Sequence, residues 1–342
     1  LRADPRDCFS STMTVALTAY LYPTVVLLGF LFTCNASALG AEDLLVALRG
    51  HEDNVYLINF TKDGKLAATA SGDNTAVLWC GQPWRKEFVL SLEGPVYAAV
   101  FSPDAQVLVT ACGDGKLVIW DVRTGQQLHS MQKHGDAIYA TAFSPDGTLL
   151  ASVGGNGNGG DTVCRVWKTS DWHLVSEFDG HTFPVYGVAF SPDGRFLATS
   201  SRDKTVRLWR LEDGRQQILT GHTSDVHRCT FSPDGKWLAT ASQDATVRIW
   251  DVAAGKCESV FTGAGDPFYA VAFSPKGRQI AAVGDDFHLR IWSLADGRPL
   301  VAEKRSYDAL YAVTYLRPNV IAVGGADTTV QVIDLGQKIE KE

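Results

Sequence analysis

The chain has 342 residues, of which 45% are hydrophobic and 20% charged, and its formal net charge is −7. It contains no block of Lys or Arg that would form a basic stripe for phosphate backbones, so we expect no nucleic-acid partner.

A stretch of about thirty residues near the start of the sequence differs from the rest of the chain in lacking charge. No charged residue lies between Ser10 and Ala41, Val25–Cys34 is the apolar centre, and Ala36-Ser37-Ala38 has the small-x-small pattern that ends secretory signals. We therefore predict that residues 1–38 are a signal peptide and that the protein is secreted or periplasmic. The pattern also fits an uncleaved membrane anchor, and a cytoplasmic location is a further alternative. The first dozen residues of the signal peptide or anchor could belong to an over-extended reading frame.

Cysteine usage does not indicate a disulfide framework. After Ala38 the cysteines are odd in number and have no pairable spacing, which is typical of small buried hydrophobes. The sequence contains no CxxC pair, which a zinc ribbon would require, and we expect no metal and no cofactor. These cysteines are Cys80, Cys112, Cys164, Cys229 and Cys257.

One phrase recurs along the rest of the chain: an aromatic residue followed by Ser-Pro-Asp-Gly or a variant of it. Successive copies are 41, 42, 47, 41, 42 and 42 residues apart. A period in the low forties indicates a supersecondary unit stacked on copies of itself. Such a repeat multiplies surface and does not by itself build a catalytic cleft. The copies begin at Phe60, Phe101, Phe143, Phe190, Phe231, Phe273 and Tyr315.

The unit that contains Phe190 shows what one repeat predicts. Its apolar and β-branched runs predict strands at Val185–Phe190, Phe196–Ser200, Thr205–Trp209 and 214–219. Pro and Gly in the phrase predict a tight turn after the first strand. Four short strands per 42 residues, with both faces apolar, fit a propeller blade. The fold class is therefore all-β, a seven-bladed β-propeller of four-stranded blades.

The pattern resembles the WD40 family over about residues 44–335. The resemblance rests on Gly-His pairs at 50–51, 180–181 and 221–222, on a turn Asp six residues before the strand Trp, and on the periodic Trp79, Trp120, Trp167, Trp209, Trp250 and Trp292. It implies that the orphan strand Leu44–Leu48 completes the last blade and closes the ring. The predicted domains are residues 1–38, a propeller over 39–335 and a charged tail over 336–342.

Ser, His and Asp recur together in three units, for example His222, Ser242 and Asp244 beside Trp250. A catalytic triad is one interpretation, but three equal copies of one active site would be unusual. In the WD40 family the set is a structural relay from the loop His through Asp and Ser to the indole N–H, and a buried Trp and His need such partners. We therefore predict no catalytic residues.

The candidate binding residues stand one position past the first apolar residue of each innermost strand. In relatives of this fold that position lies at the mouth of the central channel, and carboxylates stand shortly before it in four units. Aromatic faces beside carboxylates attract cations. The predicted site consists of Tyr56, Tyr97, Tyr139, Tyr186, His227, Tyr269 and Tyr311, with Asp53, Asp136, Asp266 and Asp308 as an acidic collar.

We therefore expect a non-catalytic scaffold that binds a protein or peptide, with a Lys- or Arg-bearing segment at this mouth. Two alternatives remain open: a propeller-type hydrolase or lactonase with a site in the channel, and the sensor domain of a membrane-tethered protein. The 47-residue spacing comes from a glycine-rich insertion at Gly154–Gly160, for which a spacer and an anion-binding nest are both possible.

Overall fold

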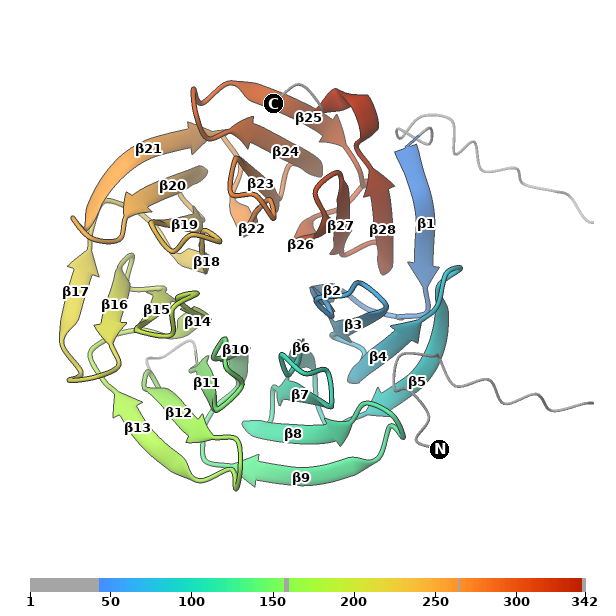
Figure 1. The fold of residues 1–342 in the computed structure, drawn as a ribbon, viewed down its shortest axis with the longest axis vertical. Coiled ribbons are helices and arrows are strands. Elements are labelled where there is room, and N and C mark those ends of the chain that lie inside the picture. Colours follow the sequence, from blue (N-terminus) through green and yellow to red (C-terminus); the bar gives the residue numbers. More distant parts are fainter. Residues whose placement is uncertain (1–42, 157–159, 264, 340–342) are drawn as a thin grey trace, which may run out of the picture.

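Seven four-stranded antiparallel sheets stand around a central axis and form a closed ring (Figure 1). The structure is a computed structural model that describes residues 43–156, 160–263 and 265–339. The predicted all-β, seven-bladed propeller is confirmed. The signal peptide or anchor predicted for residues 1–38 lies outside the described residues and stays a prediction.

The strands fall into four concentric sets. The innermost set is β2 (Val55–Phe60), β6 (Val96–Phe101), β10 (Ile138–Phe143), β14 (Val185–Phe190), β18 (Val226–Phe231), β22 (Phe268–Phe273) and β26 (Leu310–Arg317). The second set is β3 (Leu66–Ser71), β7 (Val107–Cys112), β11 (Leu149–Gly154), β15 (Phe196–Ser201), β19 (Trp237–Ser242), β23 (Gln279–Gly284) and β27 (Val320–Gly325). The third set is β4 (Thr75–Cys80), β8 (Lys116–Asp121), β12 (Cys164–Lys168), β16 (Val206–Arg210), β20 (Thr246–Asp251), β24 (His288–Ser293) and β28 (Thr329–Asp334). The outermost set is β5 (Arg85–Ser91), β9 (Gln127–Gln132), β13 (Leu174–Phe178), β17 (Gln216–Leu219), β21 (Lys256–Thr262), β25 (Pro299–Lys304) and, in the last blade, β1 (Leu44–Arg49).

The recurrent phrase forms the turn between the first and second strands of a blade. In the blade of β14, the Ser191 hydroxyl donates to Asp193 Oδ1 at 2.6 Å and accepts a hydrogen bond from the amide of Phe196 at 2.9 Å. Gly194 has φ +70°, which disfavours a residue with a Cβ. The same hydroxyl-to-Asp contact occurs in the first five blades, where it fixes the turn that starts the second strand.

The hydrophobic core is divided among the seven junctions between blades. Each apolar cluster joins side chains of two adjacent sheets, so no blade buries its faces alone. The cluster between the last and the first blade contains Leu48 of β1 together with Val55 and Trp79 of the first blade and Val330 of the last. The final junction is complete only when β1 is in place.

The predicted clasp is confirmed: β1 pairs antiparallel with β28, with Leu48 opposite Val330 and Arg49 opposite Thr329. The strand extends one residue beyond the predicted Leu44–Leu48. Ion pairs also link the two ends of the described chain. Lys338, on the short 3-10 helix η3 (Gly336–Lys338), contacts Asp43, which precedes β1, and Glu303 of β25. Both ends of the described chain thus contribute to closure. Within the described residues, no helix has the length and apolarity needed to cross a bilayer.

A pair of leucine substitutions in β1 tests the clasp. Leu48 is 3% exposed and Leu45 is 52% exposed, so the two variants differ in burial but not in strand or chemistry. We expect Leu48→Ala to lower the free energy of unfolding by about 2–5 kcal/mol. We expect Leu45→Ala to change it by less than about 0.5 kcal/mol. Urea unfolding followed by tryptophan fluorescence measures both, and equal losses would contradict the role of β1 in closure.

Candidate functional site

A β-bulge at the start of every innermost strand positions the candidate binding residues. In β2, Val55 pairs with Ser71 and Leu57 with Ala70, so Tyr56 is an extra residue without a partner in the register. The same shift occurs at the equivalent position in all seven blades. A bulge re-aims a side chain that regular alternation would place elsewhere. The bulged residues are Tyr56, Tyr97, Tyr139, Tyr186, His227, Tyr269 and Tyr311.

These seven side chains form a closed circle around the axis, which we call the aromatic ring. Each contacts the next around the axis, with ring centroids 5.0 to 5.8 Å apart, and Tyr56 closes the circle on Tyr311. Most neighbouring planes are tilted or edge-on, the arrangement that aromatic quadrupoles favour, at about 0.5–1.5 kcal/mol per pair. The structure therefore brings together all seven aromatic residues that the sequence singled out.

The ring consists of neutral groups. Burial is the main cause that raises the pKa of Tyr97, Tyr139, Tyr186 and Tyr311. Burial, the charge of Asp285 and a hydrogen bond to that carboxylate raise the pKa of Tyr269 to about 12. Burial lowers the pKa of His227, whose Nε2 lies 3.0 Å from Gln243 Oε1. The ring thus presents phenol and imidazole faces without charge at neutral pH.

The four predicted collar carboxylates occupy different environments. Asp53 and Asp308 lie close enough to Tyr311 to raise its pKa. Asp136 accepts hydrogen bonds from Asn156 Nδ2 at 2.7 Å and the amide of Asp161 at 2.9 Å, one residue from each side of the part of the insertion that the structure does not describe. Asp266 is exposed in the loop before β22, and no hydrogen bond connects it to the described residues.

The sequence analysis missed Asp285 as a site residue. Its amide donates to the carbonyl of Pro267 at 3.0 Å, directly after β23, and its charge raises the pKa of Tyr269 and Tyr311. The equivalent position after β15 is Arg202, whose charge partly opposes the rise that burial causes in the pKa of Tyr139 and Tyr186. Comparing the residue after each second strand across the repeats would have found both.

The electrostatic field around the ring is therefore uneven. Asp285, Asp308 and Asp53 gather near Tyr311, whereas Arg202, whose Nε lies 3.8 Å from Asp225, partly offsets the charge of Asp136 near Tyr139 and of Asp225 near Tyr186. We call the side of the ring formed by Tyr269, Tyr311 and Tyr56 the acidic sector. A cation that approaches the ring is attracted most strongly there.

The profile of the family described as WD domain, G-beta repeat, matches six segments of the chain: residues 42–80, 86–121, 125–168, 172–210, 214–251 and 255–293. The chain belongs to the WD40 family. Strands β26, β27 and β28 of the seventh blade lie outside the matched segments, whereas its outer strand β1 lies within the first of them; Ile333 stands on β28 in place of the strand Trp. No curated protein matches the chain. WD40 propellers are typically non-catalytic scaffolds that bind proteins or peptides.

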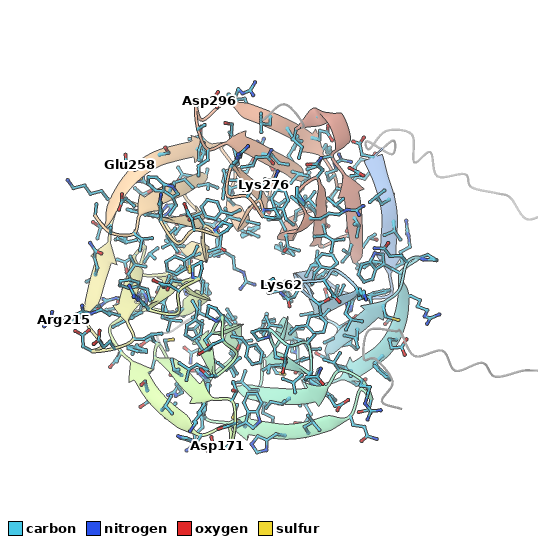
Figure 2. The ribbon with its side chains drawn as sticks, viewed as in Figure 1. Lys62, Asp171, Arg215, Glu258, Lys276 and Asp296 are labelled. Carbon is cyan, nitrogen blue, oxygen red and sulfur yellow. The ribbon has the colours of Figure 1, made fainter. Side chains whose placement is uncertain are left out.

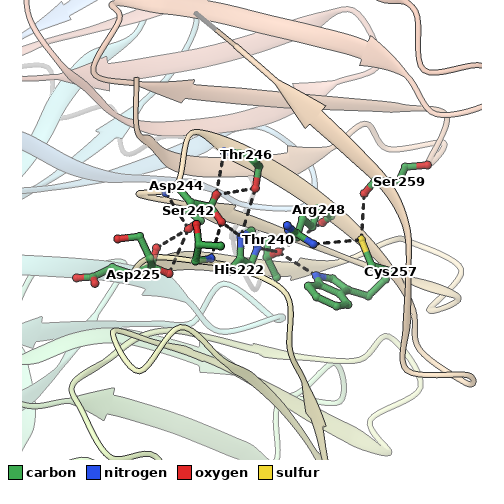
Figure 3. Close-up of polar contacts among 12 residues, drawn as sticks. His222, Asp225, Thr240, Ser242, Asp244, Thr246, Arg248, Cys257 and Ser259 are labelled. Atoms are coloured by element: carbon green, nitrogen blue, oxygen red, sulfur yellow. Dashed lines mark hydrogen bonds and ion pairs between the residues drawn. The ribbon is translucent and has the colours of Figure 1, made fainter. Parts of the chain in front are cut away.

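The recurring Ser, His and Asp of this WD40 chain form a structural network, shown for one blade in Figure 3. His222 contacts Asp244 Oδ2 through Nδ1 at 2.8 Å and Thr240 Oγ1 through Nε2 at 2.7 Å. The Trp250 indole donates to the same threonine oxygen at 2.9 Å. Burial opposes ionisation of Asp244, but hydrogen bonds from His222 and Thr246 hold the pKa of that carboxyl well below its usual range.

The predicted path through serine is wrong in one step. Thr240, and not the serine, bridges His222 and Trp250. It lies in the middle of the second strand, ten residues before the Trp, where both the imidazole and the indole reach it. Ser242 instead donates to the carbonyl of Asp225 at 2.7 Å and accepts from the amide of Asp244 at 3.1 Å, which holds the turn. In the third blade Ser152 takes the bridging place between His134 and Trp167, at 2.7 and 2.9 Å.

Two isosteric threonine substitutions test this network. Thr240→Val leaves both His222 Nε2 and Trp250 Nε1 without a partner, whereas Thr110→Val affects only Trp120 because Leu92 replaces the His in that blade. We expect losses in unfolding free energy of about 2–4 and about 1–2 kcal/mol, respectively. Denaturant unfolding measures both. A loss for Thr240→Val no larger than for Thr110→Val would contradict the bridging role.

Proposed function

We propose that this WD40 propeller is a non-catalytic interaction scaffold that docks a Lys- or Arg-bearing segment of a partner protein on the acidic sector of the aromatic ring. The observation that carries the proposal is the closed ring of uncharged aromatic faces with carboxylates on one side of it. All seven blades contribute one side chain to this ring, so the repeat as a whole builds it.

The energetics of such a site suit a modest, specific interaction. A cation over an aromatic face gains about 0.5–2 kcal/mol, depending on how far it is desolvated. Asp285 lies close enough to Tyr269 to raise the pKa of that phenol, so a carboxylate stands beside an aromatic face that a cation would contact. The carboxylate charges steer a cation toward the ring before contact is made. Several such contacts along one segment would add up to useful affinity.

The lining of the central channel gives no support to the hydrolase alternative. Among the described residues, the channel cavity beneath the ring is lined by no Asp, Glu or His, whereas acid–base or metal-assisted hydrolysis requires such groups. Nor do three His, Cys, Asp or Glu side chains gather in metal-binding geometry among the described residues. A scaffold needs neither.

Selection from a phage-displayed random peptide library against the folded chain tests the proposal. We expect enrichment of peptides with Lys or Arg. The charge-only double variant Asp285→Asn/Asp308→Asn should bind the selected peptides about threefold to tenfold more weakly, since each carboxylate contributes on the order of 0.2–1 kcal/mol. Fluorescence polarisation with the synthesised peptides measures the affinities.

The matched control removes the same charge from the outer surface. Glu212 and Glu258 are exposed, and Figure 2 places Glu258 at the periphery of the disc, away from the axis. Glu212→Gln/Glu258→Gln should leave the affinities unchanged. Enrichment of peptides without a cation, or an equal loss in the two double variants, would contradict the proposed docking site.

A further inference from the structure

Beneath the aromatic ring the channel widens into a cavity of about 830 Å³. Its wall is made by the innermost strands, and its far end is bounded by the turn phrases, including Lys62, Pro103 and Pro145. Lys62 is exposed and lies beside the central opening in Figure 2, so the cavity reaches solvent at the end away from the ring.

The charges that line this cavity have one sign. Among the described residues, Lys62 and Arg228 are the charged members of the lining, and both are cations. The chain as a whole is acidic, with a net charge of −7, which makes a carboxylate-free cavity unexpected. The interior therefore favours anions even though the rim of the ring favours cations.

Arg228 is the distinctive residue of the lining. It follows the bulged His227 directly, and its side chain borders both the ring and the cavity beneath it. The other blades have apolar or small residues at this position, which leaves the guanidinium facing open space. Those residues are Leu57, Ala98, Ala140, Gly187, Ala270 and Ala312.

The Arg228 guanidinium lacks a counter-charge in the part of the chain that the structure describes. Within the described residues it makes no hydrogen bond and no ion pair, and burial lowers the pKa of Arg228. Arg228 is half-buried in the cavity wall, and a charge that is partly shielded from water without a counter-charge gains from a partner of opposite charge. Thr230 lines the same cavity two positions along β18 and adds a hydroxyl donor on the same strand face.

We propose that the channel is a binding site for an oxyanion, a carboxylate or a phosphate, whose oxygens pair with the Arg228 guanidinium. The planar fork of Arg matches either group with two parallel hydrogen bonds. Lys62 at the open end attracts the anion, and the Thr230 hydroxyl supplies a further donor. The group belongs either to a free small molecule or to an acidic side chain of a partner inserted through the open end.

Arg228→Ala tests the site, because alanine is the residue that several other blades carry there and the variant is expected to fold. Without added anion it should be at least as stable as the native chain, since it loses an unpaired charge. Sodium phosphate or citrate, at constant ionic strength against chloride, should raise the Tm of the native chain by on the order of 2–4 °C and leave that of Arg228→Ala unchanged. Arg215→Gln, on the periphery in Figure 2, should respond like the native chain.

Peptide binding separates the two sources of the anion. A Tm response to phosphate or citrate that requires Arg228 supports a free anion. Binding of phage-selected Asp- or Glu-bearing peptides that is lost in Arg228→Ala, without a response to the free anions, supports an inserted side chain. If neither phosphate, citrate nor acidic peptides distinguish the native chain from Arg228→Ala, or if Arg228→Ala is markedly less stable, the proposal is wrong.

Discussion

The packing between adjacent blades is the interaction on which the rest of the structure depends. A single four-stranded sheet here has apolar side chains on both faces, and each of the seven clusters is completed only by the neighbouring sheet. The chain begins its described part with β1 and ends its strands with β28, so the last junction requires both ends to meet. Ring closure is therefore a condition for burying the core rather than an addition to it.

The same closure creates the site. The bulges turn seven aromatic side chains toward one axis, but the rings contact one another only because the blades are held at a fixed spacing. An open array of the same repeats would present seven separate tyrosine and histidine side chains. The proposed docking surface and the anion cavity beneath it are thus products of the whole ring, and neither can be assigned to one blade.

Periodic features were predictable from the sequence, and features set by a single blade were not. The recurrent turn phrase, the strand Trp and the aromatic positions repeat at one spacing, so the blade count followed from them, while the clasp and the place of the aromatic positions at the channel mouth followed from the orphan strand and the resemblance to the WD40 family. Asp285 occurs at its position in one blade only, and its proximity to Tyr269 depends on the geometry of the turn after β23. Thr240 resembles any β-branched strand residue, and only the folded sheet shows that its hydroxyl meets both His222 and Trp250.

The direction of the Arg228 side chain, and with it the sign of the charge inside the channel, was likewise not predictable from the sequence. Along the chain Arg228 follows His227 and so belongs to the same end of the propeller as the collar, where it would weaken the acidic field. The bulge instead directs it to the inner side of the aromatic ring, where it faces the cavity. The rim and the interior therefore differ in the sign of their charge over a short distance along one axis, which sequence periodicity alone does not reveal.

Site-specific photocrosslinking tests the docking surface most directly. Tyr307 is 68% exposed, next to Asp308 in the loop before β26, and Leu128 is 56% exposed on the outer strand β9. The photoreactive residue p-benzoylphenylalanine would be introduced at either position in the native chain and irradiated with extract of the source cells. The account predicts a crosslink from position 307 to a Lys- or Arg-bearing segment, and none from position 128. Crosslinking from position 128 alone would contradict it.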